Sequence, residues 1–269
     1  MTAMAWKPET PAPAPESAGL RRQLATLRPI GLDELGEGNL QDRIDTKFLF
    51  PAGELSSLLD ALAADYRVLE INGARLHGYQ TLYFDTPRFD LYNAQHAGRP
   101  DRYKVRSRRY IETRQAFLEV KHKNRRNRTV KNRVATGTLL TDLDADAAAF
   151  VRAHLPFSGE LEPKLWNRFS RITLVHVHEP ERLTFDLDVA FGKELITTAF
   201  PGVVVAELKQ AVLNRGSEFL RQARLRGIRA TGFSKYCIGA ALLHDDLKHN
   251  RFKPELLRAQ QLSERYLNR

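Results

Sequence analysis

Cysteine and long apolar runs are both scarce in this sequence. Cys237 is its one cysteine among 269 residues, which excludes an intramolecular disulfide framework and is typical of a reducing compartment. No uninterrupted apolar stretch approaches the roughly 18 residues that a membrane-spanning helix needs. The first residues also lack the basic and apolar regions of a signal peptide. We therefore expect a cytoplasmic protein.

Acidic residues are fewer than basic residues in this sequence. The chain has 42 Lys and Arg residues against 32 Asp and Glu, which gives a formal net charge of +10 and a sequence pI near 9.8. The hydrophobic fraction of 42% is enough for a sizeable core in a chain of this length, so the chain as a whole is not disordered. The positive surplus indicates an anionic partner without identifying it.

Composition and periodicity divide the chain into three parts. Proline and alanine alternate near the N-terminus, so we expect a disordered tail at 1–29, then a main domain at 30–246 and a helical extension at 247–269. Alternation of polar and apolar residues predicts strands at 43–48, 79–85, 103–110, 116–123, 128–135, 164–178, 182–189 and 203–209. Apolar spacing and capping residues predict helices from Pro51 to residue 62, at 144–154, at 217–226 with Ser217 as the cap, and on both sides of Pro254. This order favours an α+β fold built on an antiparallel sheet or barrel.

Charged residues on the predicted strands fall on one face, because positions i, i+2 and i+4 of a strand point the same way. One strand stacks four cations on a face with no acid between them: Arg102, Lys104, Arg106 and Arg108. Each such strand alone fits the solvated face of an antiparallel sheet. Neighbouring cations repel one another unless an anion lies among them, so together they favour a sheet rolled inward around a polyanion. Carboxylates on the same faces would then suit a divalent metal.

Short charged runs follow one another in a recognisable order. They are Arg43-x-Asp45-x-Lys47, Tyr83-Phe84-Asp85-Thr86, the basic strand at 102–108, Leu118-Glu119-Val120-Lys121, Trp166-Asn167-Arg168, Thr184-Phe185-Asp186, Glu207-Leu208-Lys209 and Ser234-Lys235-Tyr236. Over residues 41–240 this series resembles the VTC domain, the polyphosphate polymerase branch of the triphosphate tunnel metalloenzymes in the CYTH-like superfamily. The likeness is to its stand-alone bacterial form.

The resemblance implies a closed antiparallel β-barrel, the triphosphate tunnel, with flanking helices. It implies a phosphotransferase that moves the terminal phosphoryl group of a nucleoside triphosphate, expected to be ATP, to polyphosphate with Mn2+ or Mg2+. The catalytic cations that it implies are Lys47, Lys104, Arg106, Arg108, Lys121, Arg168, Lys209 and Lys235. Further phosphate contacts are expected from Arg102, Lys123, Lys131 and Arg133, and metal ligands from Glu207, Glu119 and Asp186. Two positions depart from the family pattern: Asp45 stands where Glu is usual, and Trp166 where Tyr is common.

Three functions share this set of cations. Beside the polymerase, the same tunnel suits an inorganic triphosphatase or nucleoside triphosphatase with water as the acceptor, or a non-catalytic polyphosphate-binding protein. The basic run at 121–128 lacks the interleaved aromatic residues of a nucleic-acid surface. We therefore expect no nucleic-acid partner, and we interpret Arg125 and Arg126 as solvated loop residues. The sequence allows a separately encoded membrane partner.

Overall fold

The computed structural model describes residues 16–35, 43–125, 128–156 and 159–268, so Arg126 lies outside the described residues. The helices are α1 (Glu16–Thr26), α2 (Leu55–Leu62), α3 (Asp90–His96), α4 (Ala145–His154), α5 (Glu218–Leu225), α6 (Lys235–Leu243) and α7 (Lys253–Leu267), with 3-10 turns η1 (Asp33–Leu35), η2 (Ala52–Glu54) and η3 (Asn250–Phe252). The strands are β1 (Pro29–Ile30), β2 (Ile44–Pro51), β3 (Tyr66–Leu69), β4 (His77–Asp85), β5 (Arg102–Tyr110), β6 (Ala116–Lys123), β7 (Thr129–Ala135), β8 (Glu162–His176), β9 (Glu181–Lys193), β10 (Ile196–Ala199), β11 (Val203–Gln210) and β12 (Ala230–Thr231).

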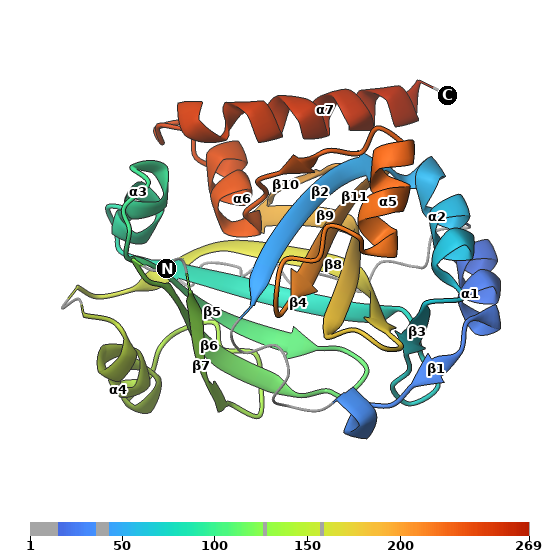
Figure 1. Cartoon of the computed structure of the whole chain (residues 1–269). Helices are drawn as coiled ribbons and strands as arrows, with labels where there is room; N and C mark the ends of the chain where they lie inside the picture. The colour runs from blue at the N-terminus through green and yellow to red at the C-terminus, as the bar shows by residue number, and fades with distance from the viewer. Residues whose placement is uncertain (1–15, 36–42, 126–127, 157–158, 269) are drawn as a thin grey trace.

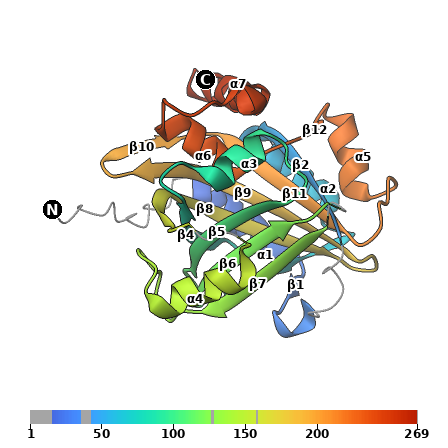
Figure 2. The ribbon, with the colours of Figure 1, turned by 90° about the vertical axis from the view of Figure 1, so that its left-hand side faces the viewer.

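These strands form one strongly curved sheet, which is antiparallel except where β1 pairs with β3 (Figures 1 and 2). Its main path runs β12-β2-β11-β9-β8-β4-β5-β6-β7, while β3 joins β8 and β10 joins β9. Within the described chain, no hydrogen-bonded ladder joins β7 to β2 or β12. The prediction of an α+β fold on an antiparallel sheet is confirmed, but the closed barrel is not, because the two ends of the sheet face each other without pairing.

Three apolar clusters hold this curvature by packing helices on the sheet. Helices α1, α2 and α5 cover the outer face of β2, β9 and β11, where Phe185 and Leu58 are fully buried. Helix α4 packs on the outer face of β4–β6, around Val105. Helices α6 and α7 pack inside one end of the curve, against inward residues such as Tyr83 and Phe169. The rest of the inner face is left to charged side chains.

The N-terminal region differs from the sequence-based expectation of a tail at 1–29. Residues from Glu16 onward are part of the fold, because α1 buries Leu24 to 1% exposure in the same cluster as Leu58, and β1 pairs with β3. Burying a leucine side chain contributes about 2 kcal/mol, which opposes the entropy of a free tail. Residues 1–15 lie outside the described part.

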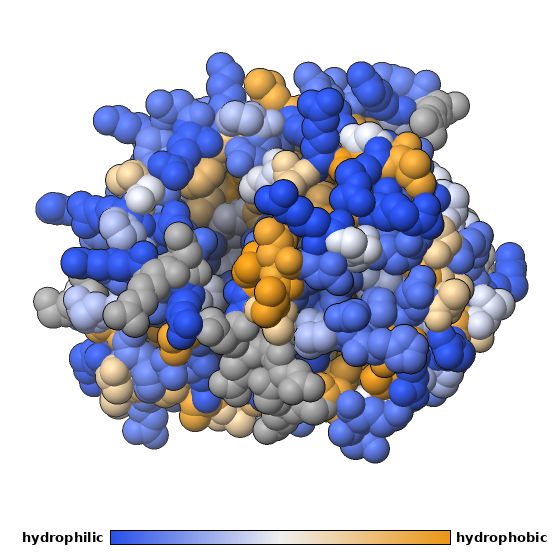
Figure 3. All heavy atoms as spheres, viewed as in Figure 1, coloured by the Kyte–Doolittle hydropathy of each residue, from blue (hydrophilic) through white to orange (hydrophobic). Residues whose placement is uncertain are grey.

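One local prediction about a helix end also changes. The Ser217 side chain does not cap α5; its hydroxyl donates to Glu181 at 2.9 Å instead. The two helices expected near Pro254 are α6 and α7, and Pro254 lies in the first turn of α7, where its missing N–H costs nothing. On the face of the molecule seen in Figure 3, hydrophilic side chains predominate around a central apolar patch.

Candidate functional site

Strands β5, β6 and β7 place the predicted cations on the inner face. Lys104 lies opposite Lys121, and Lys121 lies opposite Lys131. Residues that face one another across antiparallel strands share a face, and Val105, which alternates with them, is buried on the other side with α4. The parity predicted from the sequence is therefore confirmed for these strands.

A cavity of about 620 Å³ opens between this cationic face and the opposite end of the sheet. Its walls come from β2 and β12 on one side, β5–β7 on the other, and α6 with η3. Eight basic side chains line it: Arg43, Lys47, Arg102, Lys104, Lys121, Lys123, Arg128 and Arg251. Only two carboxylates of the described residues do so, Asp45 and Glu255. Six of these cations come from segments outside the basic strand at 102–108. Among them, Arg128 and Arg251 were not predicted to reach the cavity.

Burial shifts the pKa of two lysines that line the cavity, Lys121 and Lys104. With the described residues, Lys121 makes no hydrogen bond or ion pair, whereas Lys104 donates to the Ser234 hydroxyl at 2.9 Å. Burial lowers the pKa of Lys121 to about 7, although Glu207 opposes the shift. Burial also lowers the pKa of Lys104 to about 8, and the charge of Lys47 adds to this effect. A bound anion would favour the charged form of both lysines.

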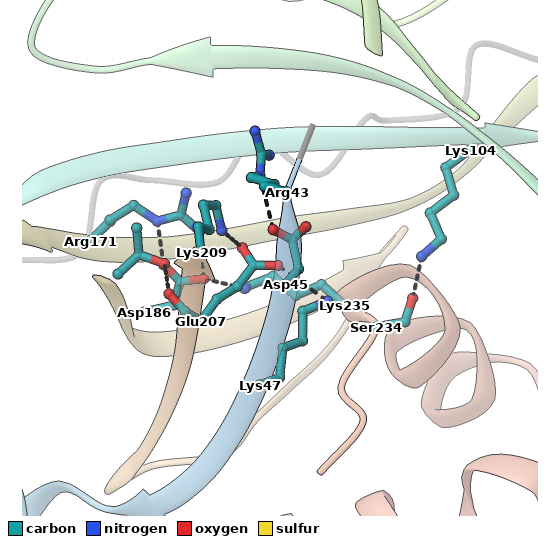
Figure 4. A network of polar contacts seen from close by, with 11 residues as sticks. Arg43, Asp45, Lys47, Lys104, Arg171, Asp186, Glu207, Lys209, Ser234 and Lys235 are labelled. Carbon is teal, nitrogen blue, oxygen red and sulfur yellow. Dashed lines mark hydrogen bonds and ion pairs between the residues drawn. The ribbon is translucent and has the colours of Figure 1, made fainter. Parts of the chain in front are cut away.

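Glu207 on β11 lies in the middle of the inner face between two lysines (Figure 4). Lys47 on β2 is its register partner and lies 3.5 Å from its Oε1, and Lys209 bonds its Oε2. Burial by itself would raise the pKa of Glu207, but Lys209, Lys47 and Lys121 hold it well below its usual range. The carboxylate is therefore ionised and forms ion pairs with Lys47 and Lys209.

Asp186 on β9 forms a second ion-pair group, with Arg171 of β8 and Lys235 of α6 (Figure 4). Arg171 Nη2 donates to Asp186 Oδ2 at 2.7 Å. Burial would raise the pKa of Asp186, but the charges of Arg171 and Lys235 lower it to about 2. Arg171 is an inner-face residue that the sequence analysis missed.

Arg168 is not brought together with these cations. It lies opposite Gln80, whereas its neighbour Asn167 lies opposite Thr81, and Thr81 is on the inner face because its hydroxyl accepts from Arg108 at 3.1 Å. Along β8 the alternate residues Asn167, Phe169 and Arg171 share the inner face, and the register shift opposite Arg168 and Ser170 places its extra residue on β9. The predicted position of Arg168 is therefore corrected, and Arg171 takes the inward position on β8.

Glu119 on β6 forms the third group. Its carboxylate accepts from Arg106 Nη2 at 2.6 Å and from Lys131 at 3.3 Å, and its side chain is 1% exposed. Burial would raise the pKa of Glu119, but Arg106, Arg108 and Lys131 lower it well below the usual value. Arg133, the register partner of Glu119, lies with its guanidinium 4.7 Å from the centroid of the Phe117 ring.

Helix α6 is fixed in place by a buried carboxylate. Asp85, at the end of β4, accepts the backbone N–H groups of Leu91 at 2.9 Å and Tyr92 at 2.8 Å, as well as the hydroxyl of Tyr236. Tyr236 is the residue next to Lys235, so this contact holds the start of α6 against the inner face. The Ser234 side chain accepts the N–H of Cys237 and caps the helix.

A family model described as the VTC domain matches residues 42–244, which is most of the chain. This chain belongs to the VTC domain family. The match contains the inner-face strands and α6, so the resemblance seen in the short charged runs is confirmed at the level of the family. A search of curated proteins finds no match.

Solved structures resemble the fold of this VTC domain at low sequence identity. A Hippeastrum protein, HpAC1, described as having a dominant triphosphatase activity, is 17% identical with a TM-score of 0.50, over 74% of this chain and 95% of that one. A Vibrio parahaemolyticus protein, described as a candidate adenylate cyclase, is 13% identical with a TM-score of 0.44, over 72% of this chain and 95% of that one. The first of these likenesses supports the tunnel-type fold alone.

The carboxylates of the VTC domain do not gather into a metal cage. No group of three or more His, Cys, Asp or Glu side chains that could hold a metal occurs in the described ranges. Each of the three predicted ligands, Glu207, Glu119 and Asp186, instead lies between cations. Mg2+ that is bound together with phosphates needs only one or two protein carboxylates. Glu207, which lies near Lys121 in the wall of the cavity, therefore fits as a single protein ligand. Among the helices that the structure describes, none combines the length and apolar content that crossing a membrane requires.

Proposed function

We propose that this chain is a polyphosphate polymerase-like phosphotransferase that uses a nucleoside triphosphate, expected to be ATP, as donor. The observation that carries the proposal is the cavity whose walls hold eight Lys and Arg side chains against two carboxylates. Such an excess of positive charge is costly when no anion is present, and a chain of phosphates supplies one negative charge after another. Membership of the VTC domain family supports the polymerase type.

In the proposed reaction, the bond between the γ-phosphorus and the β–γ bridging oxygen breaks, and a new bond forms to a terminal oxygen of the polyphosphate chain. The nucleoside diphosphate leaves. No protein nucleophile is needed, because the work of the protein in phosphoryl transfer is mainly positioning and charge neutralisation. Lys47, Lys104 and Lys121 would act as point charges on the phosphate oxygens, and Arg102 as a forked donor.

Glu207 is the residue that we expect to hold a divalent metal, Mn2+ or Mg2+, together with phosphate oxygens. When bound, the metal would neutralise charge on the transferred phosphoryl group. We also keep Glu119 and Asp186 as predicted ligands, but their side chains are only 1% and 3% exposed, against 16% for Glu207. Replacing Glu207 with Gln is expected to abolish metal-dependent turnover, and full activity of that variant would remove the metal assignment.

Hydrolysis is the second candidate function, with water replacing the polyphosphate acceptor. The fold of HpAC1, described as having a dominant triphosphatase activity, favours this alternative. The cations that hold the phosphates serve either reaction, since only the acceptor differs. A protein that only binds polyphosphate would use the same side chains without turnover.

Incubation with ATP and Mn2+ tests the three functions together. Long phosphate chains on a gel indicate the polymerase, orthophosphate alone indicates the hydrolase, and no product indicates a binder. Lys121→Met should reduce the product strongly, because it removes a cation from the cavity wall. Arg22→Gln is the matched control, since Arg22 is exposed on α1, far from the inner face. Equal activity of wild type and Lys121→Met would contradict the assignment of the cavity.

A further inference from the structure

The segment that follows α6 forms one wall of the cavity. Arg251 and Phe252 of η3 and Glu255 of α7 all line it, although they lie beyond the residues that the family model matches. The segment is tied to α3 by three hydrogen bonds. The Tyr92 hydroxyl donates to the Lys248 carbonyl at 3.0 Å, His96 Nε2 and Asn250 Oδ1 lie 2.7 Å apart, and Arg251 Nη1 donates to the His96 carbonyl at 3.5 Å. In Figure 2, α3, α6 and α7 lie together at the same end of the molecule.

Two glycines make room for the side chains of this segment. A Cβ atom on Gly98 would lie 2.4 Å from Nη1 of Arg251, and one on Gly232 would lie 2.6 Å from Oε1 of Glu255. Contacts this short do not occur with real Cβ atoms, so a larger residue at either position would make the end of the Arg251 or Glu255 side chain shift. The absence of a side chain at Gly98 and Gly232 therefore leaves room for the observed positions of Arg251 and Glu255.

Glu255 has no partner for its carboxylate in the described chain. Its Oε2 is buried and accepts no hydrogen bond, and the side chain makes no ion pair. A buried acceptor without a donor is destabilising. The N-terminal end of α7 favours a negative charge there, but it supplies no donor to Oε2. A phosphate group would be repelled by this carboxylate, whereas a ligand N–H or O–H group would satisfy it.

The same wall differs in character from the cationic strands opposite. Phe252 has its ring 5.6 Å from that of Tyr92 and 5.8 Å from that of His96, in edge-on contacts that fix its orientation. Phe233 and Ile238 line the cavity beside it. An aromatic and apolar surface next to an unpaired carboxylate suits a nucleobase, which stacks through its ring and donates through its exocyclic amine.

We propose that Glu255 and Phe252 form a nucleoside subsite at the cavity, which binds the base or ribose of a nucleoside triphosphate while the strand cations bind its phosphates. This inference rests on the proposed function, because it assigns the second half of the same substrate. The subsite makes the chain select nucleotides over inorganic tripolyphosphate. Glu255 accepts the ligand N–H or O–H, and the Phe252 ring packs on the base.

Calorimetric titration of the full chain with ATP and with inorganic tripolyphosphate, both in EDTA, tests the subsite. Glu255→Gln should weaken ATP binding about tenfold, which corresponds to the loss of a hydrogen bond to a charged acceptor. The same variant should leave tripolyphosphate binding unchanged or tighter, because a negative charge has left the cavity. Phe252→Leu should also weaken ATP selectively, by about fivefold. Glu264→Gln, on an exposed turn of α7, is the matched control.

The possible outcomes separate the subsite from the proposed function. Equal weakening of both ligands by Glu255→Gln, or weakening of neither, overturns the subsite while the phosphate site stands. If Glu255→Gln changes ATP binding only when Mg2+ is added, Glu255 acts as a metal ligand, and the proposed subsite is also overturned. If the wild type does not bind tripolyphosphate, the proposed function is overturned. If the wild type then still binds ATP and Glu255→Gln loses that binding, the nucleoside contact is supported independently of the proposed function. Thermal unfolding of each variant confirms that it is folded.

Discussion

Anion binding should draw protons onto the cavity lysines. The pKa of Lys121 is about 7 and that of Lys104 about 8 in the chain without ligand. At pH 8, Lys121 is therefore roughly one-tenth protonated and Lys104 roughly half protonated, while an adjacent phosphate restores both to nearly full charge. Binding of tripolyphosphate at pH 8 should then take up about 1.4 protons, of which about 0.9 belong to Lys121. Because the complex holds more protons than the free chain above pH 7, affinity should fall as the pH rises from 7 to 9.

Isothermal titration calorimetry in Tris and in HEPES measures this uptake, since the two buffers differ in their heat of ionisation. The titration is done in EDTA, and the protons that the ligand itself exchanges cancel in the difference between wild type and Lys121→Met. That difference should be about 0.9 protons at pH 8, whereas the exposed control Lys248→Met should show none. Lys121→Met is expected to keep its thermal stability, because the substitution removes a buried, unpaired charge. Equal uptake by wild type and Lys121→Met would refute the assignment of Lys121 to the anion site.

Three further substitutions test the structure around the site by urea unfolding. Asp85→Asn should lower the free energy of unfolding by about 2 kcal/mol, because it weakens the acceptor that holds α3 and α6; no change would contradict that role. Leu24→Ala should cost about 3 kcal/mol if α1 is packed as described, while the exposed control Arg22→Ala should cost almost nothing. Glu119→Gln should cost about 3 kcal/mol by leaving two cations uncompensated, and saturating tripolyphosphate should recover part of the loss.

The strands and their faces could be predicted because a two-residue alternation is explicit in the sequence. The predicted strand at 116–123 is observed with the same bounds, and Lys104 and Lys121 lie opposite each other as their parity requires. Arg171 was missed because the prediction placed Arg168 on the inner face, which puts the odd-numbered residues of β8 on the outer face. The pairing of Asn167 with Thr81 gives the opposite parity, and this pairing depends on how β8 lies against β4.

Residues outside the motifs were missed for a different reason. Helix α1 had a signal in the apolar spacing that includes Leu24 and Leu27, but the Pro and Ala content before it favoured a tail. Arg251 and Glu255 had no signal at all, since their place at the cavity depends on where the chain returns after α6. Hydrogen bonds to α3 hold that return, from Tyr92 to Lys248 and between His96 and Asn250, and no local pattern encodes such contacts.

The distribution of charge pairs indicates where a phosphate chain would be held most firmly. Glu119, Asp186 and Glu207 each pair with two cations, so the positive charge of the inner face between β6 and β11 is partly offset by carboxylates even without a ligand. Lys121 lies beside this region without an ion pair in the described chain. Binding free energy should therefore come mainly from the cavity lysines, because a phosphate deeper on the inner face gains attraction from cations but is repelled by their carboxylates.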